Sequence, residues 1–131
     1  SNICHPESIL NNYMNKLFYL STCSTCKRIM KKWSINQSIF LVDIKKTPLD
    51  DEDLDQLYLI TNSYEKLFNK RAQLLKKKNI SVKSLIEDDY KKLILEHYSF
   101  LKRPILMFNN KLFIGNSPNI VENAEVELSN K

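Results

Sequence analysis

The chain has 131 residues, 43% of them hydrophobic, which suits one domain with a hydrophobic core. Its formal net charge is +5, and such a surface attracts oxyanions or acidic protein surfaces. No apolar run approaches the ~20 residues of a membrane span, the N-terminus lacks the apolar segment of a signal peptide, and three cysteines do not suit a secreted disulfide scaffold. The single glycine leaves no Gly-rich phosphate loop, and we find no nucleic-acid-binding motif. We therefore expect a cytoplasmic protein that binds neither membranes nor nucleic acid directly.

The first part of the chain predicts a strand–helix–strand unit. Residues 1–13 are polar and without a clear period. We expect them to be a poorly ordered extension that was either added to the protein or comes from an alternative start of translation. Met14 would then be the natural first residue. Residues 16–20 then form a strand, 24–36 a helix, and 38–43 a second apolar strand. Because a helix joins the two strands, they should be parallel, with the second one buried on both faces.

The remainder predicts a helical block followed by a hairpin and a helix. The next helix should start at Thr47–Pro48, because proline and the following acids suit a first turn. The segment 48–99 is otherwise helical throughout. Strands at 102–108 and 111–115 follow, joined by a hairpin loop at Asn109–Asn110, and a last helix covers 118–128. This order predicts an α/β protein with a thioredoxin-like fold. Residues 14–131 would form one domain, with a mixed four-stranded sheet (βαβ…ββα) and a helical insertion between its halves.

Two cysteines, Cys23 and Cys26, lie where the first strand turns into the first helix. The C-x-x-C spacing in this position is the redox signature of thioredoxin-like proteins. A helix N-terminus favours an anion and so lowers the pKa of a thiol there, and Lys27 and Arg28 add positive charge nearby. We predict that Cys23 is the nucleophile. Cys26, one turn later on the same face, can attack a mixed disulfide formed on Cys23.

Other interpretations of these residues have less support. A zinc site would need two further ligands, and only Cys4, His5 and His97 remain, so we predict no metal. A purely structural disulfide would close a short loop and constrain little chain entropy. His97 falls late in a predicted helix, where a capping or surface role is expected.

Three stretches carry a resemblance to a known family. They are Tyr19-Leu20-Ser21-Thr22-Cys23, Leu67-Phe68-Asn69-Lys70-Arg71 and Leu101-Lys102-Arg103-Pro104-Ile105-Leu106. With them, the sequence resembles the ArsC/Spx family, which comprises arsenate reductases and related thioredoxin-fold proteins. The resemblance covers residues 14–128.

The resemblance implies a reaction and a set of site residues. The Cys23 thiolate would attack arsenate, glutathione would attack the arsenic, and glutaredoxin would complete the reduction; thioredoxin is an alternative electron donor, and no cofactor is bound. Arg103 matches a substrate-binding arginine, whose fork suits a tetrahedral oxyanion; the alternative is an ordinary surface ion pair. Pro104 would be the family's cis-proline. Further candidates for substrate binding are Lys27, Arg28, Lys70 and Arg71.

The sequence also departs from the reductases. Tyr19 and Lys27 replace their histidine and arginine around the cysteine, while Asn69 and Gly115–Asn116 fall where their other two substrate arginines lie. The C-x-x-C pair instead resembles Spx, a redox-sensing regulator that binds RNA polymerase, and a dithiol can switch by disulfide formation without arsenate. Three hypotheses follow: a thiol-dependent arsenate reductase, an Spx-like redox switch, and a thioredoxin-fold protein with neither activity.

Overall fold

Four short strands form one mixed sheet in the computed structural model, which describes residues 15–129. The strands are β1 (Lys16–Tyr19), β2 (Phe40–Asp43), β3 (Ile105–Phe108) and β4 (Lys111–Ile114), in the order β2-β1-β3-β4. β1 runs parallel to β2 and antiparallel to β3, which pairs antiparallel with β4. The predicted mixed four-stranded sheet and the predicted order of strands and helices along the chain are confirmed. The predicted extension, with Cys4 and His5, lies outside the described residues.

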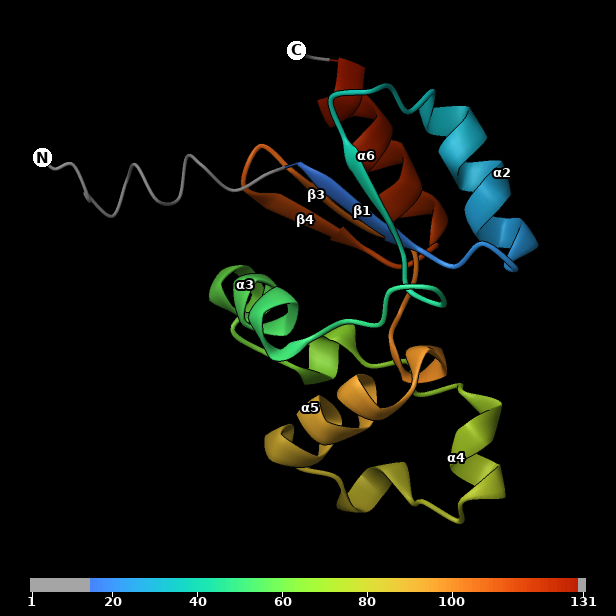
Figure 1. The fold of residues 1–131 in the computed structure, drawn as a ribbon, viewed down its shortest axis with the longest axis vertical. Helices are drawn as coiled ribbons and strands as arrows, with labels where there is room; N and C mark the ends of the chain where they lie inside the picture. Colours follow the sequence, from blue (N-terminus) through green and yellow to red (C-terminus); the bar gives the residue numbers. More distant parts are fainter. Residues whose placement is uncertain (1–14, 130–131) are drawn as a thin grey trace, which may run out of the picture.

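Helices cover the sheet and fill the insertion. Figure 1 shows α2 and α6 side by side next to the sheet, with α3, α5 and α4 below it. The helix bounds are α2 (Ser24–Trp33), α3 (Asp51–Thr61), η1 (Glu65–Leu67), α4 (Gln73–Lys77), η2 (Val82–Ser84), α5 (Glu87–Glu96), η3 (Tyr98–Phe100) and α6 (Pro118–Ser129). The chain therefore leaves the sheet after β2, builds the insertion, and returns to the sheet at β3.

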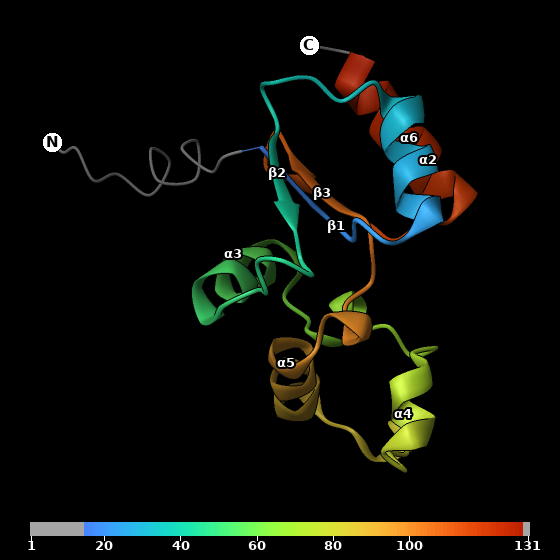
Figure 2. The same cartoon turned by 45° about the vertical axis from the view of Figure 1, so that its right-hand side comes forward.

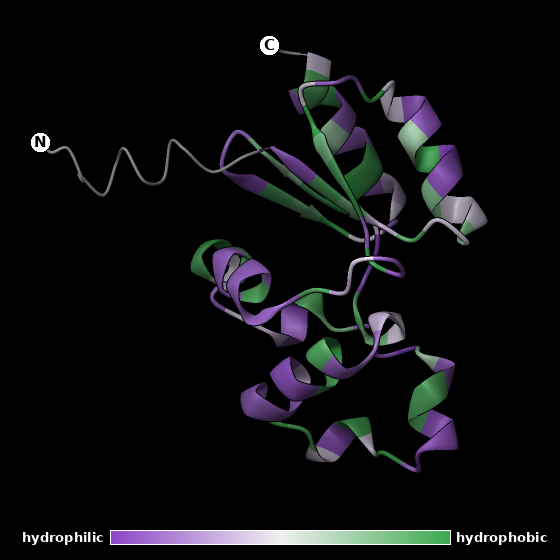
Figure 3. Cartoon of the chain, in the orientation of Figure 1, coloured by the Kyte–Doolittle hydropathy of each residue, from purple (hydrophilic) through white to green (hydrophobic). Residues whose placement is uncertain are grey.

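The two faces of the sheet bury separate cores, because successive strand residues point to opposite faces. Leu17 packs on the face covered by α2 and α6, where the Trp33 indole N–H donates to the carbonyl of Val121 over 3.0 Å. Phe18 belongs to the other core, which joins the sheet to the insertion; Figure 2 shows the two layers from a second side. Each helix in Figure 3 carries both polar and apolar residues, as a helix with one buried face should.

β2 corrects one prediction. The segment 38–43 was expected to be buried on both faces, but β2 is an edge strand, and the side chains of Phe40 and Leu41 are 53% and 44% exposed. β2 pairs with one strand of the described sheet, β1, and Val42 is the residue of β2 that is buried in the core. An apolar run alone does not distinguish a central strand from an edge strand.

Local capping sets the boundaries that differ from the predicted ones. α3 begins at Asp51 and not at Thr47–Pro48, because Asp50 and Asp53 form a capping box in which the Asp53 N–H donates to Asp50 over 2.8 Å. α2 ends at Trp33, because Ser34 adopts a left-handed conformation and its N–H donates to the carbonyl of Lys31. The predicted Asn109–Asn110 hairpin is confirmed: both residues have positive φ, 53° and 62°, as a type I′ turn requires.

Candidate active site: a dithiol at the start of a helix

The two cysteines lie at the point where β1 passes into α2. Cys23 is the N-cap residue of α2 and is half-buried, whereas Cys26 lies in the first turn and is fully buried. The turn before the helix is closed by the Cys23 N–H, which donates to the carbonyl of Leu20 over 3.0 Å, and the helix starts when the Lys27 N–H donates to the carbonyl of Cys23 over 3.2 Å. Both cysteines lie where the strand passes into the helix, as predicted. Both thiols are free.

The surroundings of Cys23 favour its thiolate. Burial acts to raise its pKa, but interactions with the backbone N–H and thiol of Cys26, the backbone N–H of Thr25 and the charge of Arg103 act in the opposite sense, and the net pKa is lowered. The backbone N–H groups of Thr25 and Cys26 are free amides of the helix N-terminus. A lowered pKa increases the fraction of Cys23 that is thiolate, the form of a cysteine that attacks.

Cys26 has the opposite character. Burial is the main reason that its pKa is raised to about 11, and the negative charge of a Cys23 thiolate raises it further. Because its sulfur interacts with that of Cys23, Cys26 can remain a thiol while Cys23 reacts and then attack the Cys23 sulfur once that charge has gone. The two thiols therefore differ in burial and in the direction of their pKa shifts; their division into an attacking and a resolving cysteine stays a prediction.

Asp43 holds the cysteine loop to the sheet. It ends β2, and its Oδ1 accepts the N–H of Ser21 and the N–H of Lys45, each over 3.2 Å. Burial acts to raise its pKa, but the hydrogen bonds with Ser21 and Lys45 and the charge of Lys46 lower it overall. No sequence motif marks Asp43 as a functional residue. Its position at the end of β2 could have indicated this role. Parallel strands end at the same sheet edge, so an acid at the end of β2 lies near the loop that follows β1.

Arg103 and Pro104 approach the same end of the sheet from the other side. The Arg103–Pro104 peptide bond is cis, as the resemblance implied. β3 pairs with β1 through Phe18 and Ile105, so extending this register puts Pro104 and Arg103 level with the start of the cysteine loop. Arg103 donates from Nη1 to the carbonyl of Leu101 over 3.1 Å, and its charge lowers the pKa of Cys23.

A hollow of about 490 Å³ adjoins Arg103. We call it the basic hollow; its polar lining includes Asn69, Arg71, Lys77, His97, Ser99 and Arg103. The structure thus brings together Arg71 and Arg103, two of the predicted substrate-binding residues. Lys77 and His97 also line it and were not predicted to bind substrate. No sequence pattern indicates this grouping, because the insertion folds residues 69–77 back against residues 97–103.

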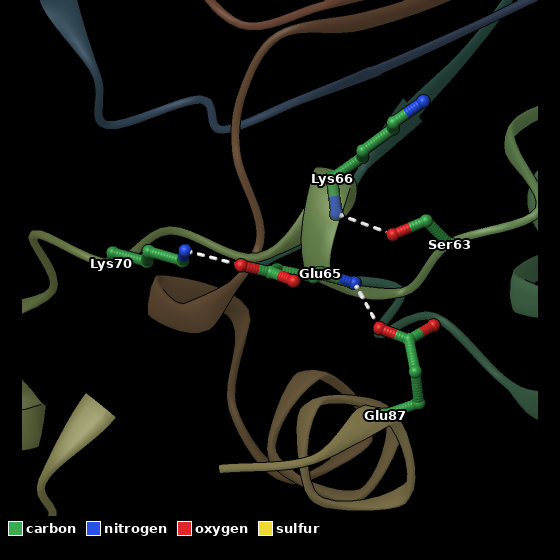
Figure 4. A network of polar contacts seen from close by, with 5 residues as sticks. All are labelled: Ser63, Glu65, Lys66, Lys70 and Glu87. Atoms are coloured by element: carbon green, nitrogen blue, oxygen red, sulfur yellow. Dashed lines mark hydrogen bonds and ion pairs between the residues drawn. The ribbon is translucent and has the colours of Figure 1, made fainter. Parts of the chain in front are cut away.

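The other predicted substrate-binding residues lie elsewhere. Lys70 forms an ion pair with Glu65, and the Glu65 N–H donates to Glu87 over 3.1 Å, so the Lys70 ammonium belongs to the network in Figure 4. Lys70 does not line the basic hollow. Lys27 and Arg28 are exposed on the first turns of α2. Their role in binding stays a prediction.

His97 caps a short helix, in line with its predicted role. Its Nδ1 accepts the N–H of Ser99 over 3.0 Å and lies 2.8 Å from the Ser99 hydroxyl, and the ring stacks on Tyr98 at 4.4 Å between centroids. Within residues 15–129, no three His, Cys, Asp or Glu side chains gather as a metal site would need. No helix in that range is long and apolar enough to cross a bilayer.

The sequence of this chain matches the model of a known protein family. The model of the ArsC family matches residues 18–124, which include both cysteines, the insertion and the Arg103–Pro104 strand. The chain belongs to the ArsC family.

Two relatives with similar sequences are named as regulators. The regulatory protein MgsR of Bacillus subtilis is 28% identical over 100 residues, covering 74% of this chain and 79% of that protein. The global transcriptional regulator Spx of Bacillus subtilis is 27% identical over 105 residues, covering 78% of this chain and 79% of that protein. The proteins with similar sequences therefore include regulators.

Solved structures of other proteins share the fold. A putative ArsC family related protein from Bacteroides fragilis has a TM-score of 0.67 at 23% identity, covering 87% of this chain and 99% of that one. A putative arsenate reductase from Yersinia pestis also has a TM-score of 0.67, at 19% identity, covering 83% and 98%. These similarities confirm the thioredoxin-like fold.

Proposed function

We propose that the protein is a thiol-dependent oxidoreductase in which Cys23 attacks and Cys26 resolves. The observation that carries this proposal is the asymmetry of the dithiol. Cys23 is accessible with a lowered pKa, and Cys26 is buried with its pKa raised to about 11. A thiolate that attacks at neutral pH beside a thiol held in reserve suits exchange between dithiol and disulfide. We expect the pair to work in a reducing cytoplasm.

As an arsenate reductase, the protein would transfer two electrons from thiols to arsenic. The Cys23 thiolate forms a sulfur–arsenic bond and water leaves. Glutathione then attacks the arsenic and a second water leaves. The glutaredoxin thiolate takes the glutathione sulfur as a mixed disulfide, which leaves arsenic(III) on Cys23 until water releases it as arsenite. Arsenic is reduced from As(V) to As(III), two thiols are oxidised, and further glutathione, or thioredoxin, restores them. Arg103 supports this assignment, because its fork suits an oxyanion.

The test is arsenate-dependent NADPH consumption with glutathione, glutaredoxin and glutathione reductase. We expect turnover that Cys23→Ser abolishes, because the attacking sulfur is gone. Cys26→Ser should keep the first attack and change only the dependence on the electron donor. Equal residual turnover in the two variants would contradict the assigned roles, and so would arsenate turnover that survives in Cys23→Ser.

A second candidate function is a redox switch that regulates transcription, and the similarity to Spx and MgsR favours it. Here a Cys23–Cys26 disulfide would change the surface around α2 and thereby change binding to RNA polymerase. The test compares polymerase capture by the reduced and the oxidised protein. Redox-dependent capture, absent in Cys26→Ser, without arsenate turnover, would establish the switch; capture that is absent in both states would exclude it.

A further inference from the structure

Two loops meet at the end of the sheet that carries the dithiol. Tyr19 of β1 lies level with Asp43 of β2, and the Ile44 N–H donates to the carbonyl of Tyr19 over 2.9 Å, so the two parallel strands stay paired up to their last residues. Beyond this point β1 continues into the cysteine loop (residues 20–23) and β2 into a turn (residues 43–47). Asp43 therefore lies where both loops leave the sheet.

Asp43 makes hydrogen bonds to both loops. Its backbone carbonyl accepts the N–H of Lys46 over 3.1 Å and that of Thr47 over 2.8 Å, and its Oδ1 accepts the N–H of Lys45 over 3.2 Å. These bonds close the turn on itself. The same Oδ1 accepts the N–H of Ser21, in the cysteine loop, over 3.2 Å. One carboxylate oxygen thus joins the cysteine loop to the turn.

The other carboxylate oxygen of Asp43 is placed unfavourably for a residue that serves stability alone. Asp43 Oδ2 is buried and, within residues 15–129, has no hydrogen-bond partner. Burial acts to raise the pKa of Asp43, but the hydrogen bonds with Ser21 and Lys45 and the charge of Lys46 lower it overall, so the carboxyl group is ionised at neutral pH. A buried charged oxygen without a donor costs free energy, and native proteins keep such groups mainly at functional positions.

The hydrogen bond from Ser21 to Asp43 lies close to the attacking sulfur. Ser21 is two residues before Cys23, the N-cap residue of α2. The backbone N–H groups of Thr25 and Cys26 favour the Cys23 thiolate, and they reach its sulfur only while the cysteine loop enters the helix in this direction. Groups preorganised around a reacting atom need other residues to hold them in place. Asp43 does so by tying the loop to a neighbouring strand.

We propose that Asp43 is a positioning residue for Cys23: through the Ser21 N–H it holds the cysteine loop so that the Cys23 sulfur stays beside the free amides at the start of α2. The inference rests on the thiol-dependent function proposed above and adds a residue that this function needs. Asp43 acts through Ser21 and exchanges neither a proton nor an electron with the sulfur.

Positioning and direct charge predict opposite effects for the loss of Asp43. Removing a negative charge near Cys23 would favour its thiolate and lower its pKa. Releasing the loop takes the sulfur away from the amides and so raises that pKa. Cys26 and Arg103 also act on the charge of Cys23, and Lys46 acts on that of Asp43; all three stay in every variant. The direction of the change therefore identifies its cause.

The experiment measures the alkylation of Cys23 by iodoacetamide against pH in the full chain, with each cysteine followed separately by peptide mass spectrometry. A rise of one unit in pKa lowers the thiolate fraction about tenfold at a pH well below the pKa. We expect Asp43→Ala to move the profile to higher pH and to slow alkylation in that range roughly threefold to tenfold. Asp43→Asn keeps an oxygen that accepts the Ser21 N–H and should stay close to the wild type.

Hydrogen exchange reports the contact itself. Followed by nuclear magnetic resonance, the Ser21 amide should be protected in the wild type and in Asp43→Asn, and should exchange faster in Asp43→Ala. If Asp43→Ala does not fold, Asp43→Glu decides between the causes. It keeps the charge but displaces the carboxylate by one methylene, so positioning predicts slower alkylation of Cys23 and charge alone predicts no change.

The matched control is Asp50→Ala. Asp50 also accepts a backbone N–H, that of Asp53 over 2.8 Å, but it caps α3 and, within residues 15–129, makes no hydrogen bond to the cysteine loop. Its loss removes a cap without releasing the loop. The Cys23 profile should therefore stay that of the wild type, although the protein becomes less stable.

The outcomes separate this inference from the proposed function. The inference is wrong if the Cys23 profile of Asp43→Ala is unchanged or moves to lower pH, if Asp43→Asn slows Cys23 as much as Asp43→Ala does, or if Asp50→Ala gives the same shift. In each case a wild-type Cys23 that titrates below a free thiol leaves the proposed function standing. A wild-type profile with the pKa of an ordinary cysteine, about 8.5, would overturn both proposals.

Discussion

A single arginine, Arg103, connects the two chemical features of this protein. Its charge favours the thiolate of Cys23, and its side chain forms part of the wall of the basic hollow. We predict that Arg103→Ala raises the pKa of Cys23, so that its alkylation by iodoacetamide reaches half of its maximal rate at a higher pH than in the wild type. Cys26 should alkylate slowly throughout, since it is buried and its pKa is raised to about 11.

Two further variants control this pH profile. Arg103→Lys keeps the charge and should stay close to the wild type, whereas a shift as large as that of Arg103→Ala would mean that the guanidinium acts through its shape. Lys27→Ala removes a charge that the sequence assigned to the site, and we expect it to move the profile less than Arg103→Ala does. An unchanged profile in Arg103→Ala would contradict the electrostatic role.

At the scale of the element, β2 shows how much the place of a strand in the sheet decides. Phe40 and Phe18 are the same residue type in neighbouring parallel strands, but Phe40 is 53% and Phe18 is 1% exposed. We predict that Phe18→Ala lowers the free energy of unfolding by about 3–5 kcal/mol and Phe40→Ala by less than about 1 kcal/mol. Urea denaturation followed by circular dichroism measures both. Similar losses in the two variants would show that the edge of β2 is covered in solution.

The same contrast explains what the sequence can predict. Local patterns fix local features: C-x-x-C after an apolar strand located the strand-to-helix turn, and Asn109–Asn110 located the hairpin. Strand order depends on pairing between distant segments, so the apolar run at 38–43 did not reveal an edge strand. The basic hollow has the same origin, because Arg71 and Arg103 meet only when the insertion folds back.

For the whole molecule, the arrangement of the two cores predicts how it unfolds. One core packs α2 and α6 on the sheet around Trp33, and the other packs the insertion on the opposite face, with Phe18 of β1 and Phe100 of η3 in one cluster. Because β1 contributes to both cores, the insertion and the sheet should unfold together as one cooperative unit.

This cooperativity can be tested with two probes. Trp33 is the single tryptophan and its fluorescence reports the core under α2 and α6, while far-ultraviolet circular dichroism includes the helices of the insertion. We predict coincident urea transitions. Phe100 is fully buried and stacks on Phe68 at 5.6 Å between ring centroids. Phe100→Ala should therefore cost about 3–5 kcal/mol and move both transitions equally, although Phe100 and Trp33 belong to different cores. If the dichroism transition alone moved to lower urea, the insertion would unfold independently, and Arg71 and Lys77 could leave the neighbourhood of Arg103 while the dithiol stayed in place.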